Sequence, residues 1–231
     1  MTHQRPICTY ISRLALSLLL LAFTFATAHA QSKLFAIQKD SVPLLNGFAL
    51  SFDLVGPAMH AMGDYGEYEA AIRVNLHNQY FPIVEVGYGM ANHRNDEVTG
   101  ISYKTQAPYF RIGCDMNLLK NKHAPHRLYG GLRYAFTAYN VDVSRNPQPD
   151  PIWGNMTVFS VNGQSCDQHW LEVVVGLDAK MWGPLHLGWA VRYKRRIAHR
   201  DLPEGNTWYI PGYGKCGDTR IGANFNVIID I

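Results

Sequence analysis

The stretch RIGANFNVIIDI, residues 220–231, alternates along almost its whole length between two kinds of side chain. One side of an extended strand carries the apolar residues Ile221, Ala223, Phe225, Val227, Ile229 and Ile231. The other side carries Arg220, Gly222, Asn224, Asn226 and Asp230, with Ile228 as the exception. This alternation predicts a β-strand with one apolar and one polar face.

Further segments upstream repeat the pattern, at residues 47–55, 67–77, 84–91, 110–118, 128–137, 171–180 and 185–194. Since no segment of comparable length has a helical period, the sequence predicts an all-β fold. The connections near residues 78–79 and 182–184 are short, whereas those at 92–102, 144–168 and 198–218 are long. Short turns at one end and long loops at the other are typical of outer-membrane barrels. We therefore predict an eight-stranded antiparallel up-and-down transmembrane β-barrel over residues 46–231.

The first residues have the pattern of an export signal. Arg5 and Arg13 precede the short apolar run LALSLLLLAFTFA, residues 14–26, and Ala28-His29-Ala30 follows as a cleavage site. This order predicts a secretory signal peptide over residues 1–30. We expect residues 31–45 to form a short lead-in to the barrel, and the mature chain to lie outside the cytoplasm.

The charge balance limits the classes of partner. The chain has 21 basic and 18 acidic residues, and Arg5 and Arg13 of the leader are two of the basic ones. The mature chain is therefore almost neutral, which argues against nucleic acid as a partner. No later segment approaches 18 uninterrupted apolar residues, the minimum for a spanning helix. A membrane-spanning form of this chain must therefore be a closed barrel.

The polar face of the predicted strands combines small residues with charges. Gly87, Gly113 and Gly176 are examples of the small residues, and they alternate with long ionic side chains. Because side chains just fill the interior of an eight-stranded barrel, this mixture suits a lumen. Buried charges must also be mutually paired. We therefore predict a lumen charge network of Glu69, Arg73, Glu85, Arg111, Asp115, Arg133, Glu172, Asp178, Lys180, Arg192 and Arg220.

Two alternatives place the polar face in water. It could form a water-exposed surface with many salt bridges, or the chain could be a soluble periplasmic barrel that holds an apolar ligand inside.

The membrane arrangement implies outer-membrane lipid and the outer-membrane assembly machinery as partners. In that arrangement the last strand pairs with the first, so that no sheet edge faces lipid. Ile231 departs from the aromatic residue that is typical at the end of such strands.

Several strand phrases carry a resemblance: YEAAIRVNL, PIVEVGYG, YKTQAPYFRIGCDMN, RLYGGLRYAF, GWAVRYKRR and WYIPGYG. In these phrases, over most of residues 40–231, the chain resembles the uncharacterised small outer-membrane β-barrel proteins of Bacteroidota, a family with a domain of unknown function. The resemblance implies an exported barrel in the outer membrane of a Gram-negative bacterium. It brings no assigned activity and no functional residues.

Candidate catalytic groups lie in the expected outer loops. They are His93, His169 and His199, the nearby Asp96, Asp167 and Asp201, and the hydroxyls of Ser102, Ser144 and Ser165. Proximity in sequence does not make a triad, and no nucleophile-elbow motif is present. We therefore predict no catalytic residues and no cofactor. His123 and His126 have metal-ligand spacing, but Pro125 and the short turn disfavour a shared metal, so we predict no metal site.

Two loop features remain. Cys166 and Cys216 precede strands at the same end of the barrel, and we predict a disulfide between them, whereas Cys114 is an apolar filler. The aromatic residues Trp153, Trp208, Tyr209 and Tyr213 are candidates for loop-mediated binding. The residues 208–214, WYIPGYG, could instead fold back over the barrel mouth.

The sequence therefore predicts a barrel with a plugged, charged lumen and a non-enzymatic role, either as an envelope scaffold or in loop-mediated binding of a surface or envelope partner. An enzyme of the outer rim, acting on lipid or peptide, is the alternative. Fractionation and heat-modifiable gel mobility would distinguish a membrane barrel from a soluble one.

Overall fold

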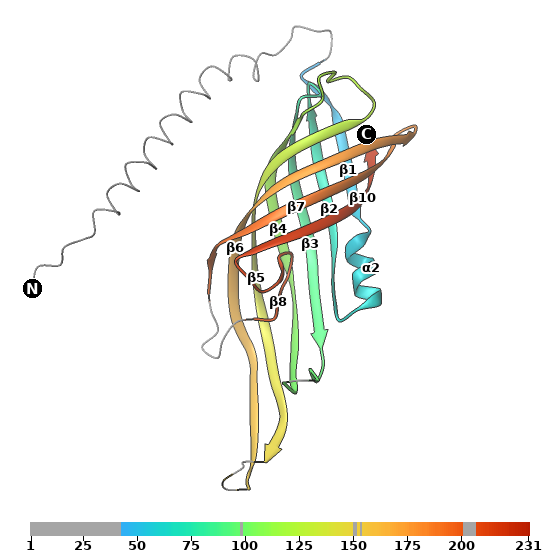
Figure 1. Ribbon diagram of the computed structural model, residues 1–231. Coiled ribbons are helices and arrows are strands. Elements are labelled where there is room, and N and C mark those ends of the chain that lie inside the picture. Colours follow the sequence, from blue (N-terminus) through green and yellow to red (C-terminus); the bar gives the residue numbers. More distant parts are fainter. Residues whose placement is uncertain (1–42, 98, 150–151, 153, 201–206) are drawn as a thin grey trace, which may run out of the picture. The chain divides into compact units, whose positions relative to one another are not determined.

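A computed structural model gives the fold, and it describes residues 43–97, 99–149, 152, 154–200 and 207–231. The predicted signal peptide and most of the predicted lead-in lie outside the described residues, as does Trp153. Strands β1–β7 and β10 pair in the closed order β1-β10-β7-β6-β5-β4-β3-β2. Every pairing in this ring is antiparallel, and β1 pairs with β10 to close it. The predicted eight-stranded up-and-down barrel is therefore confirmed (Figure 1).

The ring strands span Leu45–Asp53 (β1), Tyr65–Leu76 (β2), Tyr80–His93 (β3), Ile101–Asn117 (β4), Arg127–Pro149 (β5), Met156–Trp182 (β6), Leu185–His199 (β7) and Thr219–Asp230 (β10). Tight turns join β2 to β3 and β6 to β7. His77 and Asn78 in the first turn and Gly183 in the second have positive φ angles. This backbone is typical of two-residue hairpins, because its twist matches that of the flanking strands.

Three elements depart from the prediction. A helix, α2 (Val55–Met62), connects β1 to β2 where a loop was expected. The two-residue strands β8 (Tyr209–Ile210) and β9 (Gly214–Lys215) pair within the long connection before β10. The expected loop at residues 144–168 is instead mostly paired strand, which continues to the pair Pro149 and Met156. As a result, the β5–β6 hairpin projects well past the other strands (Figure 1).

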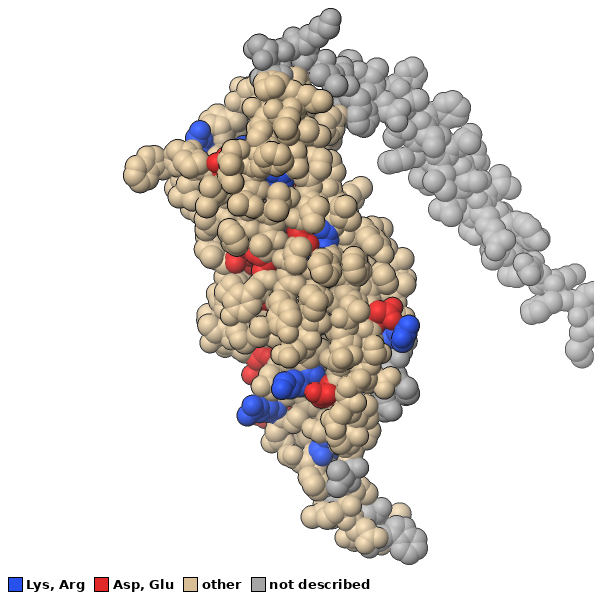
Figure 2. Space-filling view, turned by 180° about the vertical axis from the view of Figure 1, so that it is seen from behind, with Lys and Arg blue, Asp and Glu red and all other residues tan. Residues whose placement is uncertain are grey.

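Alternation sorts the side chains of each strand into an inner and an outer set. In β2, Glu69 and Arg73 are buried inside, whereas Tyr68 and Ile72 are about half exposed outside. The ring thus has a polar lumen and an apolar exterior, and charged side chains occupy little of the face seen in Figure 2. Among the described residues, no helix is long and apolar enough to cross a bilayer.

Candidate functional site

The lumen holds a connected set of charged side chains with Glu85 at its centre. Arg192 donates to Glu85 at 2.7 Å, and Arg133 lies 2.9 Å and Arg111 3.2 Å from the same carboxylate. All four groups are at most 2% exposed. A carboxylate that is held by three guanidinium groups is compensated in a medium where an isolated charge would be very costly.

Two more carboxylates complete this layer of the lumen. Glu69 pairs with Arg111 and with Arg192, the latter at 2.9 Å. Glu172 lies 3.0 Å from Arg111 and 3.3 Å from Arg192. The side chains reach one another across the ring, because they project from β2, β3, β4, β5, β6 and β7. The layer therefore ties most strands of the barrel together through its centre.

A second layer lies nearer the tight turns. Arg73 donates to Asp178 at 2.5 Å and lies 3.4 Å from Asp115, while Arg133 donates to Asp115 at 3.0 Å. The guanidinium of Arg73 also stacks over the Tyr129 ring, 4.6 Å from its centroid. Since Arg133 contacts Glu85 as well as Asp115, the two layers form one network.

The predicted lumen residues can now be placed. Nine of them lie buried in this network: Glu69, Arg73, Glu85, Arg111, Asp115, Arg133, Glu172, Asp178 and Arg192. The inclusion of Lys180 is wrong, because Lys180 lies two residues before the end of β6, at the rim of the barrel, and is exposed although it pairs with the buried His186. Arg220 is also outside the network, since it lies at the start of β10 and donates to the backbone carbonyls of Lys215 and Cys216.

An aromatic plug, Trp208–Gly214, covers the outer end of this network. Tyr209, Ile210 and Tyr213 are at most 2% exposed and pack with buried residues of the barrel wall, among them Tyr109 and Trp170. The segment folds back into the barrel mouth, as one of the two sequence interpretations expected. The prediction that Tyr209 and Tyr213 take part in loop-mediated binding is therefore wrong, because both rings are buried in the barrel.

The plug is bonded to the charges beneath it. The carbonyl of Gly212 accepts hydrogen bonds from Arg111 at 2.7 Å and from Lys194 at 2.8 Å. Gly212 has φ +78, and a Cβ there would lie 2.4 Å from the Tyr109 ring. Only glycine fits this position, because both the backbone angle and the close approach exclude a side chain.

Sequence reasoning missed the aromatic partners of the network. The Trp170 indole donates to Glu172 at 2.6 Å, and the Tyr109 hydroxyl donates to Glu69 at 2.9 Å. The signal was present, since each aromatic residue stands two positions before a buried charge, Trp170 before Glu172 and Tyr109 before Arg111. Alternation therefore places all four side chains on the same, inner face.

The outer-end histidines do not converge on one reacting group. His93 lies 2.7 Å from Asp64 and 3.3 Å from Asp96, and its ring stacks on Trp208. His169 faces outward, where its Nδ1 is 2.7 Å from the Tyr134 hydroxyl. The Ser102 hydroxyl accepts a hydrogen bond from the Asn95 backbone amide. His199 ends β7, and Asp201 is outside the described residues.

The remaining candidates lie apart. His123 contacts Asn78, at 3.0 Å, whereas His126 accepts from the backbone amide of Lys180 at 3.2 Å. No group of three metal-binding side chains gathers anywhere in the described part of the chain. The structure contains no disulfide between Cys166 and Cys216, so that prediction is wrong. The Cys166 thiol points to the Gln164 carbonyl, and the Cys216 thiol lies beside Arg196.

A family model described as a domain of unknown function, DUF6048, matches residues 10–230. No curated protein matches the chain. Among solved structures, Neisserial surface protein A is 11% identical with a TM-score of 0.42, covering 81% of this chain and 99% of that one. A major outer membrane protein from Thermus thermophilus is 14% identical with a TM-score of 0.45, covering 80% and 100%. Acinetobacter baumannii CarO2 is 12% identical with a TM-score of 0.41, covering 81% and 99%. At these values the similarities say nothing about what this chain binds.

Proposed function

We propose that this chain, which belongs to the DUF6048 family, is a non-enzymatic outer-membrane protein with a closed lumen that presents its outer loops to a surface or envelope partner. An export signal at residues 1–30, insertion by the outer-membrane assembly machinery, and a Gram-negative, Bacteroidota source belong to the same proposal. The observation that carries it is the distribution of side chains across the wall of the barrel.

The exterior of the ring is apolar where a water-soluble protein would be polar. Ile72 is 53% exposed, Ile112 60%, Leu132 65% and Val191 56%, and these four come from β2, β4, β5 and β7. Soluble monomers rarely expose continuous apolar surface beyond a few hundred Å². A belt of this kind around a closed barrel matches the apolar band of transmembrane barrels.

Aromatic residues lie on the same outer face as this belt. Tyr68 and Tyr88 are direct partners on neighbouring strands, and both are exposed. Tyr134 and Tyr193 are exposed as well, and Tyr134 pairs with Ile112 within the belt. At the opposite end, Trp182 in the tight β6–β7 turn region is 86% exposed. Tyrosine and tryptophan are enriched at both membrane–water interfaces, because each combines an apolar ring with a polar group. Their positions support a belt with two interfaces.

The lumen supports neither a wide pore nor a carrier of an apolar ligand. The space at its centre, lined by Glu69, Arg73, Glu85 and neighbouring side chains, has a volume of about 10 Å³. This is room for about one water molecule. The surrounding groups are charged, so an apolar ligand would leave them without partners.

The β5–β6 hairpin supports a binding role outside the membrane. It projects past the other strands (Figure 1), and near its tip Ile152 is 81% and Met156 67% exposed. These two side chains supply apolar contact surface on a projecting element, and a partner that covered them would remove that surface from water. The partner would meet this hairpin rather than the lumen.

Fractionation of cells that express the full chain tests the proposal. We expect the protein in the outer membrane, released by detergent alone, with faster gel mobility before heating than after it. A chain that stays monomeric and soluble without detergent would contradict the proposal. Reproducible hydrolysis of a lipid or peptide by the purified folded barrel would contradict its non-enzymatic part.

A further inference from the structure

The wall of the barrel has a gap where β1 ends early. β1 pairs with β10 only as far as Asp53 and Asn226, and with β2 only as far as Phe52 and Ala70. Both neighbours continue beyond these pairs, β2 to Tyr65 and β10 to Thr219. Helix α2 occupies the wall at this place (Figure 1).

Helix α2 packs closely on one side of the gap only. A Cβ at Gly66 would lie 2.4 Å from the Cβ of His60, which shows how near the helix lies to β2. On the other side, the hydrogen bonds to β10 come from the two residues that precede the helix. The Leu54 amide donates to the Phe225 carbonyl, and the Phe225 amide donates to Asp53. The seam between α2 and β10 is therefore the open side of the gap.

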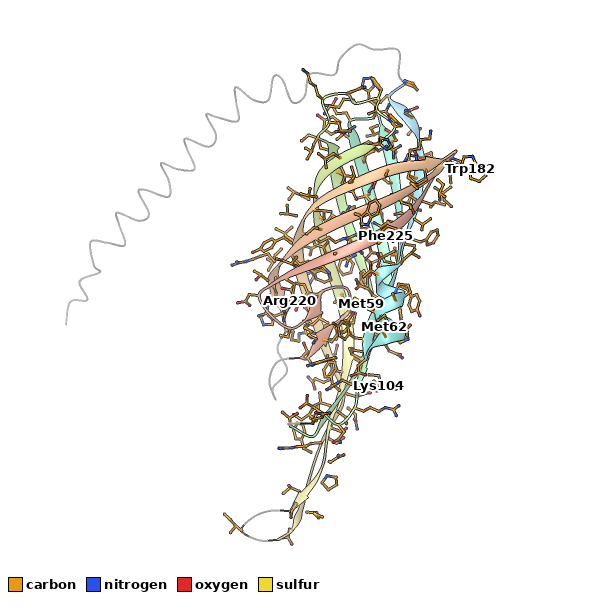
Figure 3. All side chains as sticks on the ribbon, turned by 45° about the vertical axis from the view of Figure 1, so that its right-hand side comes forward. Met59, Met62, Lys104, Trp182, Arg220 and Phe225 are labelled. Carbon is orange, nitrogen blue, oxygen red and sulfur yellow. The ribbon has the colours of Figure 1, made fainter. Side chains whose placement is uncertain are left out.

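Two cavities meet at this seam. An inner one of about 380 Å³ is lined by residues that include Asp53, Glu67 and Arg220, and an outer one of about 500 Å³ by residues that include Met62 and Phe225. Val55, Met59 and Tyr65 line both cavities, so these three residues lie where the two cavities adjoin. Figure 3 labels Met59 and Met62 on α2 and Phe225 on the adjacent part of β10. Each volume is in the range of small-molecule pockets.

The two cavities differ in chemistry. The lining of the outer cavity is almost entirely apolar, from Leu54, Val55, Ala58, Met59, Met62 and Phe225. The inner cavity is lined by three cations, Lys194, Lys215 and Arg220, and by two carboxylates, Asp53 and Glu67. A molecule that fills both would have an apolar end in the wall and a polar end inside the barrel.

The charges of the inner cavity favour an anion. Lys194 donates to the carbonyls of Gly212 and Tyr213, and Arg220 donates to backbone carbonyls as described above. The Lys215 ammonium lies 5.5 Å from the centroids of the Tyr65 and Trp208 rings. Both carboxylate oxygens of Asp53 accept backbone hydrogen bonds. Lys194 therefore has backbone carbonyls and the nearby Glu67 as partners, whereas Lys215 has rings and Arg220 has carbonyls. A carboxylate beside Lys215 and Arg220 would form charge-assisted hydrogen bonds.

We propose that this seam is a lateral binding site for a long-chain fatty acid, with its alkyl chain in the outer cavity and its carboxylate in the inner cavity beside Lys215 and Arg220. The acid enters sideways from the membrane, since the outer cavity opens on the apolar belt. The site is separate from the hairpin tip, and binding to it can be measured in micelles whether or not the proposed partner exists.

Electron paramagnetic resonance of spin-labelled stearic acid with the full-length folded protein tests the site. We expect an immobilised fraction in wild type, and at least a tenfold weaker affinity in the double variant K215Q/R220Q. Met59→Trp, which places a larger ring in the passage, should abolish the immobilised fraction. Met181→Trp on the exposed outer face of β6 and Lys180→Gln are the matched controls, and both should bind like wild type.

Competition with unlabelled molecules distinguishes the contribution of the ligand's carboxylate from that of its alkyl chain. Stearic acid should displace the labelled probe, whereas stearyl alcohol should do so at least tenfold less well. Equal displacement by the alcohol, or equal binding by K215Q/R220Q, would overturn the assignment of the carboxylate. Unchanged binding by Met59→Trp would overturn the position of the site. Heat-modifiable gel mobility confirms that every variant compared is folded.

Discussion

At the scale of single residues, Glu85 contacts more arginines than any other carboxylate of the lumen network. Three arginines contact it, and each of them also contacts another carboxylate. Such a network stabilises the barrel only as a complete set. The Coulomb attraction offsets the cost of desolvating the groups, and the removal of one member leaves its partners buried without compensation.

Replacement of Glu85 by alanine should therefore destabilise the folded barrel strongly. We expect a loss of about 3–5 kcal/mol in the free energy of unfolding, because three guanidinium groups lose a shared carboxylate. Urea unfolding of the protein in micelles measures the change. Lys180→Ala is the control, since that side chain is exposed, and its midpoint should not move. Equal midpoints for both variants would show that the network adds no stability.

His93 lies past the apolar belt, at the outer end of β3, and its carboxylate partners affect its titration. The hydrogen bond with Asp64 is the main cause that raises the pKa of His93 above its ordinary value of 6.5. The interaction therefore stabilises the fold fully below about pH 6.5, and this contribution is lost as the pH rises through the raised pKa. The aromatic contact between His93 and Trp208 places the titrating ring against the plug.

Asp64→Asn should lower the pKa of His93, because a neutral amide favours the imidazolium less than a carboxylate does. A proton NMR titration of the imidazole resonances in micelles measures this pKa. Asp142→Asn in the β5–β6 hairpin is the control and should leave the titration unchanged. A His93 pKa that is the same in wild type and D64N would show that the hydrogen bond does not form.

The alternation of the sequence predicted the lumen residues well wherever a strand is regular. Glu69, Arg111 and Glu172 follow the inner face without interruption. For Lys180 alternation gives the face but not the exposure, because this residue lies at the end of β6, where the inner face reaches the rim of the barrel. The sequence predicted that Cys166 and Cys216 lie at the same end of the barrel. It could not predict in which direction each thiol points.

At the scale of elements, helix α2 and the long β5–β6 hairpin were not predicted from the sequence. The helix has eight residues, and a helix this short depends on packing rather than on its own propensity. The packing that holds it is the contact of Gly56 with Glu67 of β2 and of His60 with Gly66 of β2, which no local pattern predicts. In the hairpin, residues 144–168 were expected to be a long connection, although the strands continue through two register shifts.

Removal of the outer part of this hairpin should leave the barrel intact. Replacing residues 146–157 with an Asn-Gly turn should preserve heat-modifiable mobility and the urea midpoint, because the segment lies beyond the buried cluster. A longer deletion, of residues 141–164, should lower the midpoint, since it removes the fully buried Val141. Equal effects of the two deletions would show that the tip stabilises the barrel.

At the scale of the whole molecule, the lumen is closed twice, by the aromatic plug and by the charge network beneath it. The two closures share the Gly212 carbonyl but are made of different residues. The sequence predicted the network from the balance of opposite charges on one face. It left the position of the plug open between two interpretations, because the distinction depends on tertiary contacts of Tyr209 and Tyr213.

Replacement of residues 208–214 by a glycine–serine segment of equal length should therefore not open a channel. We expect no steady ion conductance in planar bilayers from wild type or from this variant, since the network still fills the barrel. Combining the replacement with Glu85→Ala should raise the conductance, provided that the barrel remains folded. Steady conductance in the single replacement would show that the plug alone closes the lumen.

The position of the plug inside the ring also constrains the order of assembly. The plug belongs to the connection between β7 and β10, so it has to be enclosed as β10 meets β1. The arginines of the lumen would each be costly to carry through hydrocarbon unpaired. We therefore expect the charged groups and the tyrosines of the lumen to pair with one another before β10 meets β1 and closes the ring.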